Sequence, residues 1–513
     1  MEMKLKGFFI FGEGKMDEIV VIDYGSQYTQ LLARRVRELG VFSKVVGPDY
    51  TFTGKESGII LSGGPESVYE KRYDLPQFSG IPVLGICYGM HLLAERFGGH
   101  VAKGAHGEYG LTKVKFFPSP LFEGIPSESV TWMSHGDVVE VLPPNFKMTA
   151  ISETGITAAF ESENDKIYAI QFHPEVVHTS YGREIIKNFV FGICKERPEW
   201  TMNNFIDSEI SRIKSVVKDQ KIISAISGGV DSTVATLLTY RAVGDNLIPV
   251  FVDHGLLRKM DINVPQTLAT LGIKVKYVNA SELFFEKLKG VSDPEEKRKI
   301  IGNTFIEVFE REAKASGATF LLQGTIYPDV IESAASSQRS AKIKSHHNVG
   351  GLPEKMNLKV LEPLRTLFKD EVREVGRLMG LPDAFISRHP FPGPGLGVRV
   401  IGEITREKVG ILRDADDIFV NVLMRAGEYS KIWQAFAVLL PVRSVGVKGD
   451  ARSYEYVLAL RAVDSVDGMT ASWHQIPFEI LRMASSEITS KIPQIGRVVY
   501  DITDKPPSTI EWE

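Results

Sequence analysis

The chain has 513 residues, of which 43% are hydrophobic and 24% are charged, the composition of an ordinary soluble globular protein. This length exceeds what one hydrophobic core supports, so about three domains are expected. The net charge of −4 comes without a basic tract, which argues against a nucleic-acid partner. Two cysteines exclude a disulfide framework and a cysteine-rich zinc site, and they favour a reducing, cytoplasmic setting. No apolar stretch approaches the roughly 20 residues that cross a bilayer, so no membrane partner is expected.

Residues 1–16 are expected to be an N-terminal extension that takes no part in the fold. Their apolar core, residues 7–11, is shorter than the roughly 7–15 residues of a signal-peptide core, and no small-residue cleavage site follows it. Met16 directly precedes the first clear strand.

Short apolar runs at residues 19–22, 58–61 and 82–86 predict buried strands of a parallel sheet. They alternate with helical segments, the last of them residues 183–195, which indicates an α/β sheet with helices on both faces. A linking helix with apolar residues at helical spacing follows residue 200.

A second α/β unit is predicted from the strands 222–226, 247–252 and 319–322. Beyond a Pro/Gly-rich boundary at 388–395, the pattern changes to a smaller α+β unit. Its predicted elements are strands at 442–447, 454–463 and 497–502 and a helix at 480–492. The fold class is therefore two consecutive α/β sheet domains, 17–199 and 200–388, followed by an α+β C-terminal domain, 389–513.

Cys87 lies between a strand and a helix and is flanked by Gly85 and Gly89. A strand–turn–helix of this kind exposes a nucleophile at the end of a sheet, and small residues let the backbone crowd the turn. The N-terminus of the following helix favours a thiolate over a thiol. Cys87 is therefore a candidate nucleophile. Cys194, which lies late in a helix with no glycine turn after it, is expected to be a packing residue.

Partners for Cys87 are expected far along the chain, at residues 171–175. His173 is the candidate general base, and Glu175 is the group that orients its imidazole. A spacing of two residues in an extended segment places both side chains on the same side. The backbone N–H groups of Gly63, Gly64 and Tyr88 are candidates for an oxyanion hole.

These residues together resemble the class I (triad) glutamine amidotransferases over roughly residues 18–193. The resemblance implies that Cys87, His173 and Glu175 hydrolyse glutamine through a glutamyl-thioester and release ammonia. The family commonly has Gln where this chain has His91, and that Gln can touch the substrate. The glutamine contact at this position is therefore left open.

Residues 227–233, Ser-Gly-Gly-Val-Asp-Ser-Thr, follow a buried strand and open a helix. Small residues let successive backbone N–H groups face a phosphate, and the helix dipole adds attraction. The lysine of a Walker A loop is missing. The segment resembles the pyrophosphate loop of the N-type ATP pyrophosphatases, which have an adenine-nucleotide α-hydrolase-like fold. That resemblance implies transfer of AMP from ATP and release of pyrophosphate.

The expected ATP-binding residues are Ser227, Gly228, Gly229, Val230, Asp231, Ser232, Thr233, Val252, Gln323, Gly324 and Lys344. Val252 falls where this fold receives adenine, and Lys344 belongs to a basic segment expected to act as a lid over the phosphates. Mg²⁺ prefers carboxylate and phosphate oxygens. The candidate Mg²⁺ ligands are Asp231, Asp329 and Glu332.

The Pro/Gly-rich segment 388–397 and the C-terminal segment 505–513 resemble the GMP synthetase family closely. The resemblance implies a ligase that converts ATP, XMP, glutamine and water to AMP, pyrophosphate, GMP and glutamate, by way of an O2-adenylyl-XMP intermediate. It implies XMP contacts at Arg258, Arg388, Gln434, Lys505 and Glu511. The third domain resembles the family's dimerisation module, which implies a homodimer.

The nearest alternative is another glutamine-dependent ATP-pyrophosphatase amidotransferase, such as an NAD synthetase, which would lack the Pro/Gly-rich loop and this C-terminal segment. A tRNA-thiolating enzyme would need further reactive cysteines and a basic face. A non-catalytic binding protein would need neither site. The expected partners are therefore the small molecules glutamine, XMP and ATP.

Overall fold

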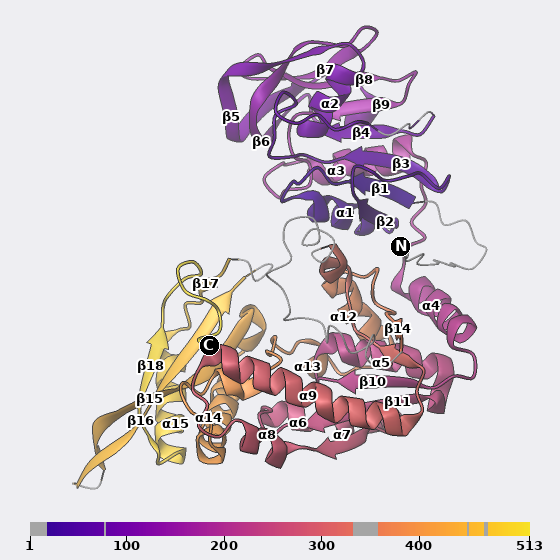
Figure 1. Cartoon of the computed structure of the whole chain (residues 1–513). Helices are drawn as coiled ribbons and strands as arrows, with labels where there is room; N and C mark the ends of the chain where they lie inside the picture. The colour runs from indigo at the N-terminus through magenta and orange to yellow at the C-terminus, as the bar shows by residue number, and fades with distance from the viewer. Residues whose placement is uncertain (1–17, 76–77, 79, 332–357, 449–450, 466–469) are drawn as a thin grey trace. The chain divides into compact units, whose positions relative to one another are not determined.

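The computed structural model describes residues 18–75, 78, 80–331, 358–448, 451–465 and 470–513. The chain forms two compact units, the first ending at Ser208 and the second running Glu209–Glu513 (Figure 1). The expected extension 1–16 lies outside the described residues.

The first unit is built on a nine-stranded mixed sheet in the order β2-β1-β3-β4-β9-β8-β7-β5-β6. The parallel strands are β2 Ser43–Val46, β1 Glu18–Ile22, β3 Glu56–Leu61, β4 Val83–Ile86 and β9 Ile167–Ile170. The antiparallel strands are β8 Thr157–Ser162, β7 Lys147–Ser152, β5 His100–Phe116 and β6 Glu128–Val141. Strands β1, β3 and β4 were predicted from the sequence, whereas β2, β9 and the antiparallel half were not.

Helices cover the parallel half of this sheet. They are α1 Thr29–Arg37, α2 Tyr88–Arg96 and α3 Gly182–Lys187, with a short 3₁₀ turn, η1 Pro120–Phe122, elsewhere in the unit. Every residue of β1 and β4 is buried, as expected for strands covered on both faces. The helix predicted at 183–195 is α3 followed by a π-helical segment, η2 Asn188–Ile193.

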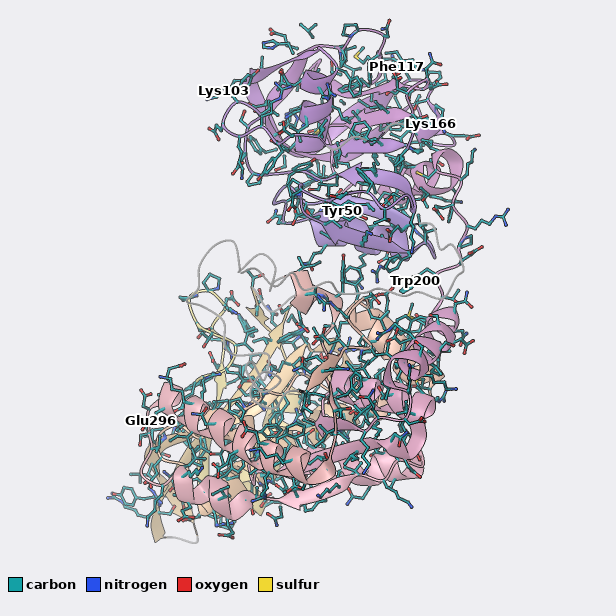
Figure 2. All side chains as sticks on the ribbon, turned by 45° about the vertical axis from the view of Figure 1, so that its right-hand side comes forward. Tyr50, Lys103, Phe117, Lys166, Trp200 and Glu296 are labelled. Carbon is teal, nitrogen blue, oxygen red and sulfur yellow. The ribbon has the colours of Figure 1, made fainter. Side chains whose placement is uncertain are left out.

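Figure 2 shows the side chains of the chain, among them Tyr50 and Trp200 of this unit. Tyr50, labelled there, connects β2 to β3: its hydroxyl accepts from Lys44 Nζ at 2.7 Å and donates to Glu56 Oε1 at 2.7 Å. Trp200 packs against Phe42, with ring centroids 4.8 Å apart. Its backbone N–H donates to Gly40 O at 2.7 Å, so the segment after η2 returns to the end of α1.

The second unit contains a five-stranded, all-parallel sheet in the order β12-β11-β10-β13-β14. Its strands are β10 Ile222–Ile226, β11 Leu247–Asp253, β12 Lys276–Asn279, β13 Phe320–Leu322 and β14 Lys359–Leu361. Helix α4 Met202–Val217 contains the boundary between the two units. The other helices of this part are α5 Val230–Val243, η3 Gly244–Asn246, α6 Lys259–Ile262, α7 Val264–Thr270, α8 Ser281–Lys287, α9 Pro294–Ser316, α12 Lys369–Leu378 and α13 Asp383–Ile386.

The sequence sets both ends of the long helix α9. Asp293 Oδ1 accepts from the backbone N–H of Glu296 at 2.8 Å, and Pro294 occupies the first turn. Gly317 ends the helix with φ +66°, a left-handed conformation that glycine adopts without strain.

The remaining elements form an α+β arrangement. Its members are η4 Gly395–Val398, α14 Arg406–Arg425, η5 Tyr429–Lys431, β15 Gln434–Lys448, β16 Ala451–Asp464, β17 Ser472–Trp473, α15 Phe478–Lys491 and β18 Ile495–Asp501. Strand β16 pairs antiparallel with β15 and parallel with β18. One hydrophobic core includes Ile223 of β10 and Leu458 of β16. The predicted fold class, α/β followed by α+β, is confirmed.

The predicted helix and strands of the C-terminal part are also confirmed, with β15 and β16 longer than expected. Within the described part of the chain, no helix is long and apolar enough to span a membrane.

Candidate functional site

The segment around Cys87 is a tight strand–turn–helix. Cys87 follows β4 directly and is the N-cap of α2, with φ +51° and ψ −107°. A Cβ added to Gly85 would lie 2.7 Å from Gly89 O, and one added to Gly89 would lie 2.5 Å from Leu61 O. Glycine is therefore required on both sides of the cysteine. A positive φ is unusual for a residue other than glycine, and such strain is concentrated at functional sites.

His173 and Glu175 lie together although 171–175 forms a turn and not the extended segment that the sequence suggested. His173 Nδ1 and Glu175 Oε1 are 2.8 Å apart, and the two residues are 3% and 1% exposed. Strand β6 helps to fix the position of this turn, because the backbone N–H of His173 donates to Trp132 O at 3.0 Å. Thr179 Oγ1 donates to His173 O at 2.6 Å.

Gly63 is the point at which these segments converge. A Cβ added there would lie 3.2 Å from His173 Cε1 and 3.7 Å from Cys87 Cβ. The three segments come from β3, β4 and the end of β9, neighbouring parallel strands whose carboxyl ends share one edge of the sheet. The fold thus brings Cys87, His173 and Gly63 together across a wide separation in sequence.

The charge state of His173 follows from its neighbours. Burial by itself lowers the pKa of His173, but the negative charge of Glu175 and the hydrogen bonds to Cys87 and Glu175 outweigh it, raising the pKa to about 10. At neutral pH the imidazole is therefore cationic, between a carboxylate and a sulfur atom. Such a group can hold a proton next to a nucleophile and return it to a leaving group.

The second candidate site is the loop between β10 and α5. Gly228 has φ +84°, a conformation that favours glycine. Ser232 Oγ donates to Gly229 O at 3.1 Å and lies 3.0 Å from Ser227 Oγ. A Cβ added to Gly324 would lie 3.0 Å from the backbone N of Ser232. The Ser232 hydroxyl therefore links the two ends of the loop, and the segment after β13 packs against the start of α5.

Other expected ATP-binding residues have different surroundings. Val252 belongs to β11 and is 3% exposed, whereas Gln323 and Gly324 are half-buried just after β13. Lys344 lies outside the described residues.

Lys369 is a residue of this site that the sequence interpretation missed. Its Nζ lies 2.6 Å from both carboxylate oxygens of Asp231. Lys369 begins α12, far along the chain from the loop, so no local pattern could have linked the two. Lys369 thus places a positive charge at a loop whose sequence lacks the lysine of a Walker A loop.

Of the three candidate magnesium ligands, the structure describes Asp231 and Asp329. Asp329 Oδ2 accepts from the backbone N–H of Ile326 at 3.1 Å, and Glu332 lies outside the described residues. Among the residues described, no three His, Cys, Asp or Glu side chains are close enough to hold a metal ion. Mg²⁺ commonly uses one or two carboxylates together with substrate phosphates. Asp231 belongs to the loop and offers one carboxylate of this kind, which in this structure contacts Lys369 Nζ through both oxygens at 2.6 Å.

Four of the five expected XMP residues fall into two clusters, of which the first centres on Asp261. Arg258 Nε donates to Asp261 Oδ2 at 2.7 Å, and Arg388 Nη1 lies 3.7 Å from Oδ1. Asp261 is itself close to Gly228, since a Cβ there would lie 3.8 Å from Asp261 Cβ. Two arginines therefore lie beside the phosphate loop around one buried carboxylate.

The second cluster centres on Glu511. Gln434 Nε2 donates to Glu511 Oε1 at 2.9 Å, and Arg399 Nη2 donates to the same oxygen at 2.9 Å. Arg399 is fully buried and was not predicted. Lys505 pairs through its backbone with Ala471, and its N–H donates to Ala471 O at 2.7 Å.

The C-terminal segment that carries Lys505 and Glu511 is anchored by two buried cations, Arg461 and Lys297, and by the half-buried Arg298. Arg461 is fully buried and donates to five acceptors, Asp501 Oδ2, Thr503 O, Ser508 Oγ, Thr509 O and Ile510 O. Lys297 and Arg298, in the first turns of α9, bind Glu513, so the end of the chain lies beside that helix (Figure 1).

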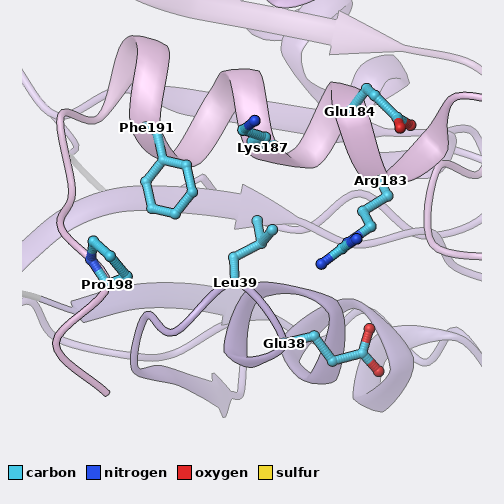
Figure 3. A pocket seen from close by; sticks show the side chains of 7 residues that line it. All are labelled: Glu38, Leu39, Arg183, Glu184, Lys187, Phe191 and Pro198. Atoms are coloured by element: carbon cyan, nitrogen blue, oxygen red, sulfur yellow. The ribbon is translucent and has the colours of Figure 1, made fainter. Parts of the chain in front are cut away.

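A separate pocket of about 390 Å³ opens between the end of α1 and the helical segment α3–η2 (Figure 3). It is lined by Glu38, Leu39, Arg183, Glu184, Lys187, Phe191 and Pro198. None of the expected site residues lines it.

Two family models match separate parts of the chain. Residues 20–193 match the family model described as glutamine amidotransferase class-I, and residues 421–512 match the model described as GMP synthase C terminal domain. The chain is 55% identical to the GMP synthase [glutamine-hydrolyzing] of Petrotoga mobilis, over 97% of this chain and 100% of that protein. It is 56% identical to the protein of the same name from Thermotoga maritima, over 96% of this chain and 100% of the relative. For that of Aquifex aeolicus the identity is 55%, over 96% of this chain and 99% of the relative. At this identity over nearly the full length, the chain belongs to the family of glutamine-hydrolysing GMP synthases.

Proposed function

We propose that the chain makes GMP from XMP, with nitrogen taken from glutamine and energy from ATP. The observation that carries the proposal is the presence, in one chain, of the Cys87–His173–Glu175 arrangement and a phosphate loop backed by Asp231 and Lys369. Its relatives are GMP synthases over their full length, so the alternative of an NAD synthetase is not favoured.

In the glutaminase half, Cys87 attacks the side-chain amide of glutamine. His173 holds the proton that leaves the thiol and gives it to the departing ammonia, and Glu175 keeps the imidazole oriented through Nδ1. The backbone N–H groups of Gly63, Gly64 and Tyr88 are assigned to the oxyanion. Water, with His173 as base, then hydrolyses the thioester to glutamate.

In the synthetase half, residues 227–233 hold the β- and γ-phosphates of ATP, with Val252, Gln323, Gly324 and Lys344 as further contacts to the nucleotide. O2 of XMP attacks the α-phosphorus, pyrophosphate leaves, and the oxygen becomes part of a good leaving group. Ammonia then adds at C2 and AMP departs. The protein's part is to position the reactants and to neutralise charge, to which Lys369 beside Asp231 is suited.

XMP is assigned to the residues around Asp261 and Glu511. Its 5′-phosphate calls for cations, which Arg258, Arg388 and Lys505 provide. Gln434 and Glu511 lie 2.9 Å apart through their side chains and offer donors and acceptors suited to a purine edge.

Mg²⁺ would be held by phosphate oxygens of ATP and by Asp231, with Asp329 and Glu332 as further candidates. When bound, it would neutralise charge on the phosphates. The division into domains 17–199, 200–388 and 389–513, a homodimer formed through the last of these, and a cytoplasmic location complete the proposal.

The decisive experiment is product analysis with XMP, ATP and glutamine labelled with ¹⁵N in its amide. The expected result is labelled GMP with one AMP and one pyrophosphate for each GMP formed. ADP and phosphate as products would refute the assignment of residues 227–233 as a pyrophosphate loop. If XMP remained unchanged, the proposal that XMP accepts the ammonia would be refuted.

A further inference from the structure

His91 and Gln171 form a buried hydrogen bond behind the proposed glutaminase residues. His91 Nε2–H donates to Gln171 Oε1 over 2.8 Å. The two residues are 4% and 0% exposed. Among the described residues, Gln171 Nε2 has no hydrogen-bond partner, so the contact with His91 is the one bond this side chain makes there.

Each partner of this bond belongs to the element that carries one of the reacting groups. His91 lies one turn after Cys87 in α2, and its backbone N–H donates to Cys87 O at 3.2 Å. Gln171 lies in the same short turn as His173. The bond therefore ties the helix that carries the sulfur to the turn that carries the imidazole.

A backbone bond already joins these segments at a neighbouring point, because the N–H of Cys87 donates to Ile170 O at 2.8 Å. This single hydrogen bond fixes the distance between α2 and the segment after β9, but the helix can still rotate about the bond. A second bond, made one helical turn further along α2, also limits how the helix can turn relative to residues 171–175. This matters at Cys87, whose φ of +51° persists only where the surroundings over-determine the backbone.

The surroundings of His91 are unsuited to direct contact with glutamine. Its side chain is enclosed, and burial lowers the pKa of His91 to about 4 against the opposing effect of the bond to Gln171. At neutral pH the imidazole is uncharged and uses Nε2–H in that bond. It therefore offers no positive charge to a substrate carboxylate.

We propose that His91 and Gln171 are positioning residues, whose hydrogen bond sets the orientation of Cys87 relative to His173 for glutamine hydrolysis. This rests on the proposed roles of Cys87 and His173. It answers the question left open by the sequence at His91, because the residue acts through protein geometry and not through the substrate.

The test measures glutaminase kcat and KM for His91→Phe, which keeps the ring but loses the donor, and for His91→Gln, which keeps a donor. His91→Phe is expected to lower kcat on the order of ten- to a hundredfold, the loss that follows a misplacement of about 1 Å, with KM for glutamine within about twofold. His91→Gln should restore most of kcat. Ammonium-dependent GMP synthesis, which needs neither residue, should be unchanged in both and reports folding.

Gln171→Met removes the same bond from the other side and should lower kcat similarly. The double variant His91→Phe/Gln171→Met should be no slower than the slower single variant, because both changes remove one interaction. A raised KM with unchanged kcat would overturn the proposal in favour of substrate contact, and strictly multiplicative losses would overturn the pairing. The variant Cys87→Ala distinguishes failure of this proposal from failure of the proposed function. If its glutaminase activity survived, the proposed function itself would be refuted.

Discussion

Replacing Arg461 by methionine is expected to release the C-terminal segment 502–513 and to weaken XMP binding selectively. The guanidinium is fully buried and serves five acceptors on that segment and on Asp501. A hydrogen bond to a charged group contributes about 1.5–3 kcal/mol, but Thr503 and Thr509 are exposed and water can replace the arginine at their carbonyls. Removing one member of a buried ion pair costs about 3–5 kcal/mol.

A loss of about 3 kcal/mol would shift the docking equilibrium of this segment roughly a hundredfold. Because Lys505 and Glu511 are proposed to hold XMP, its KM should rise at least about tenfold, while KM for ATP should change less than about twofold. The kinetics are measured with ammonium as the nitrogen source, which bypasses the glutaminase. Hydrogen exchange of residues 502–513 should accelerate in parallel.

Two further variants make this test specific. Arg443 lies on the same sheet but is exposed, and its Nη1 donates to Tyr454 O at 3.2 Å within the same hairpin, so Arg443→Met should leave both readouts unchanged. Arg461→Lys keeps the charge but cannot reach five acceptors with one ammonium group, and it should be intermediate. Wild-type XMP kinetics and exchange in Arg461→Met would show that this anchor does not support the XMP site.

Cys87→Ala should abolish glutamine-dependent synthesis and preserve synthesis from ammonium, whereas Cys194→Ala should keep both; loss of both activities in folded Cys87→Ala would refute the division of labour. Lys369→Ala should lower GMP formation from either nitrogen source on the order of tenfold or more, as loss of a charge-assisted contact predicts, and normal ATP kinetics would contradict its role at the loop. Glu175→Gln removes the charge that raises the pKa of His173 to about 10. A raised pKa of His173 stabilises the folded state fully below the pKa of about 6.5 that histidine has in the unfolded chain, and this stabilisation is lost as pH rises through about 10. The free energy of unfolding in urea should therefore be larger for wild type than for Glu175→Gln at pH 6, and the difference should shrink towards pH 10. An advantage independent of pH would contradict this origin.

Local patterns in the sequence determined the parts of both sites that lie next to each other along the chain. A buried strand, a turn of small residues and a helix were readable around Cys87 and around 227–233, because the required backbone shape restricts residue choice at each position. At Gly89, an added Cβ would lie 2.5 Å from the carbonyl oxygen of Leu61, so a larger residue does not fit. At Gly228, φ is +84°, a conformation that favours glycine.

Tertiary structure alone decided which distant residues meet. The turn at 171–175 was misread as extended, yet His173 reaches Cys87 because neighbouring parallel strands end at one edge of the sheet. Lys369 contacts Asp231 although the two are 138 residues apart in the sequence. Arg461 donates hydrogen bonds to acceptors at the end of the chain. A single Lys or Arg carries no periodicity or turn signal of its own, and on sequence alone it is expected at the surface. Its partner is set by strand order and helix packing, which the pattern along the chain does not record.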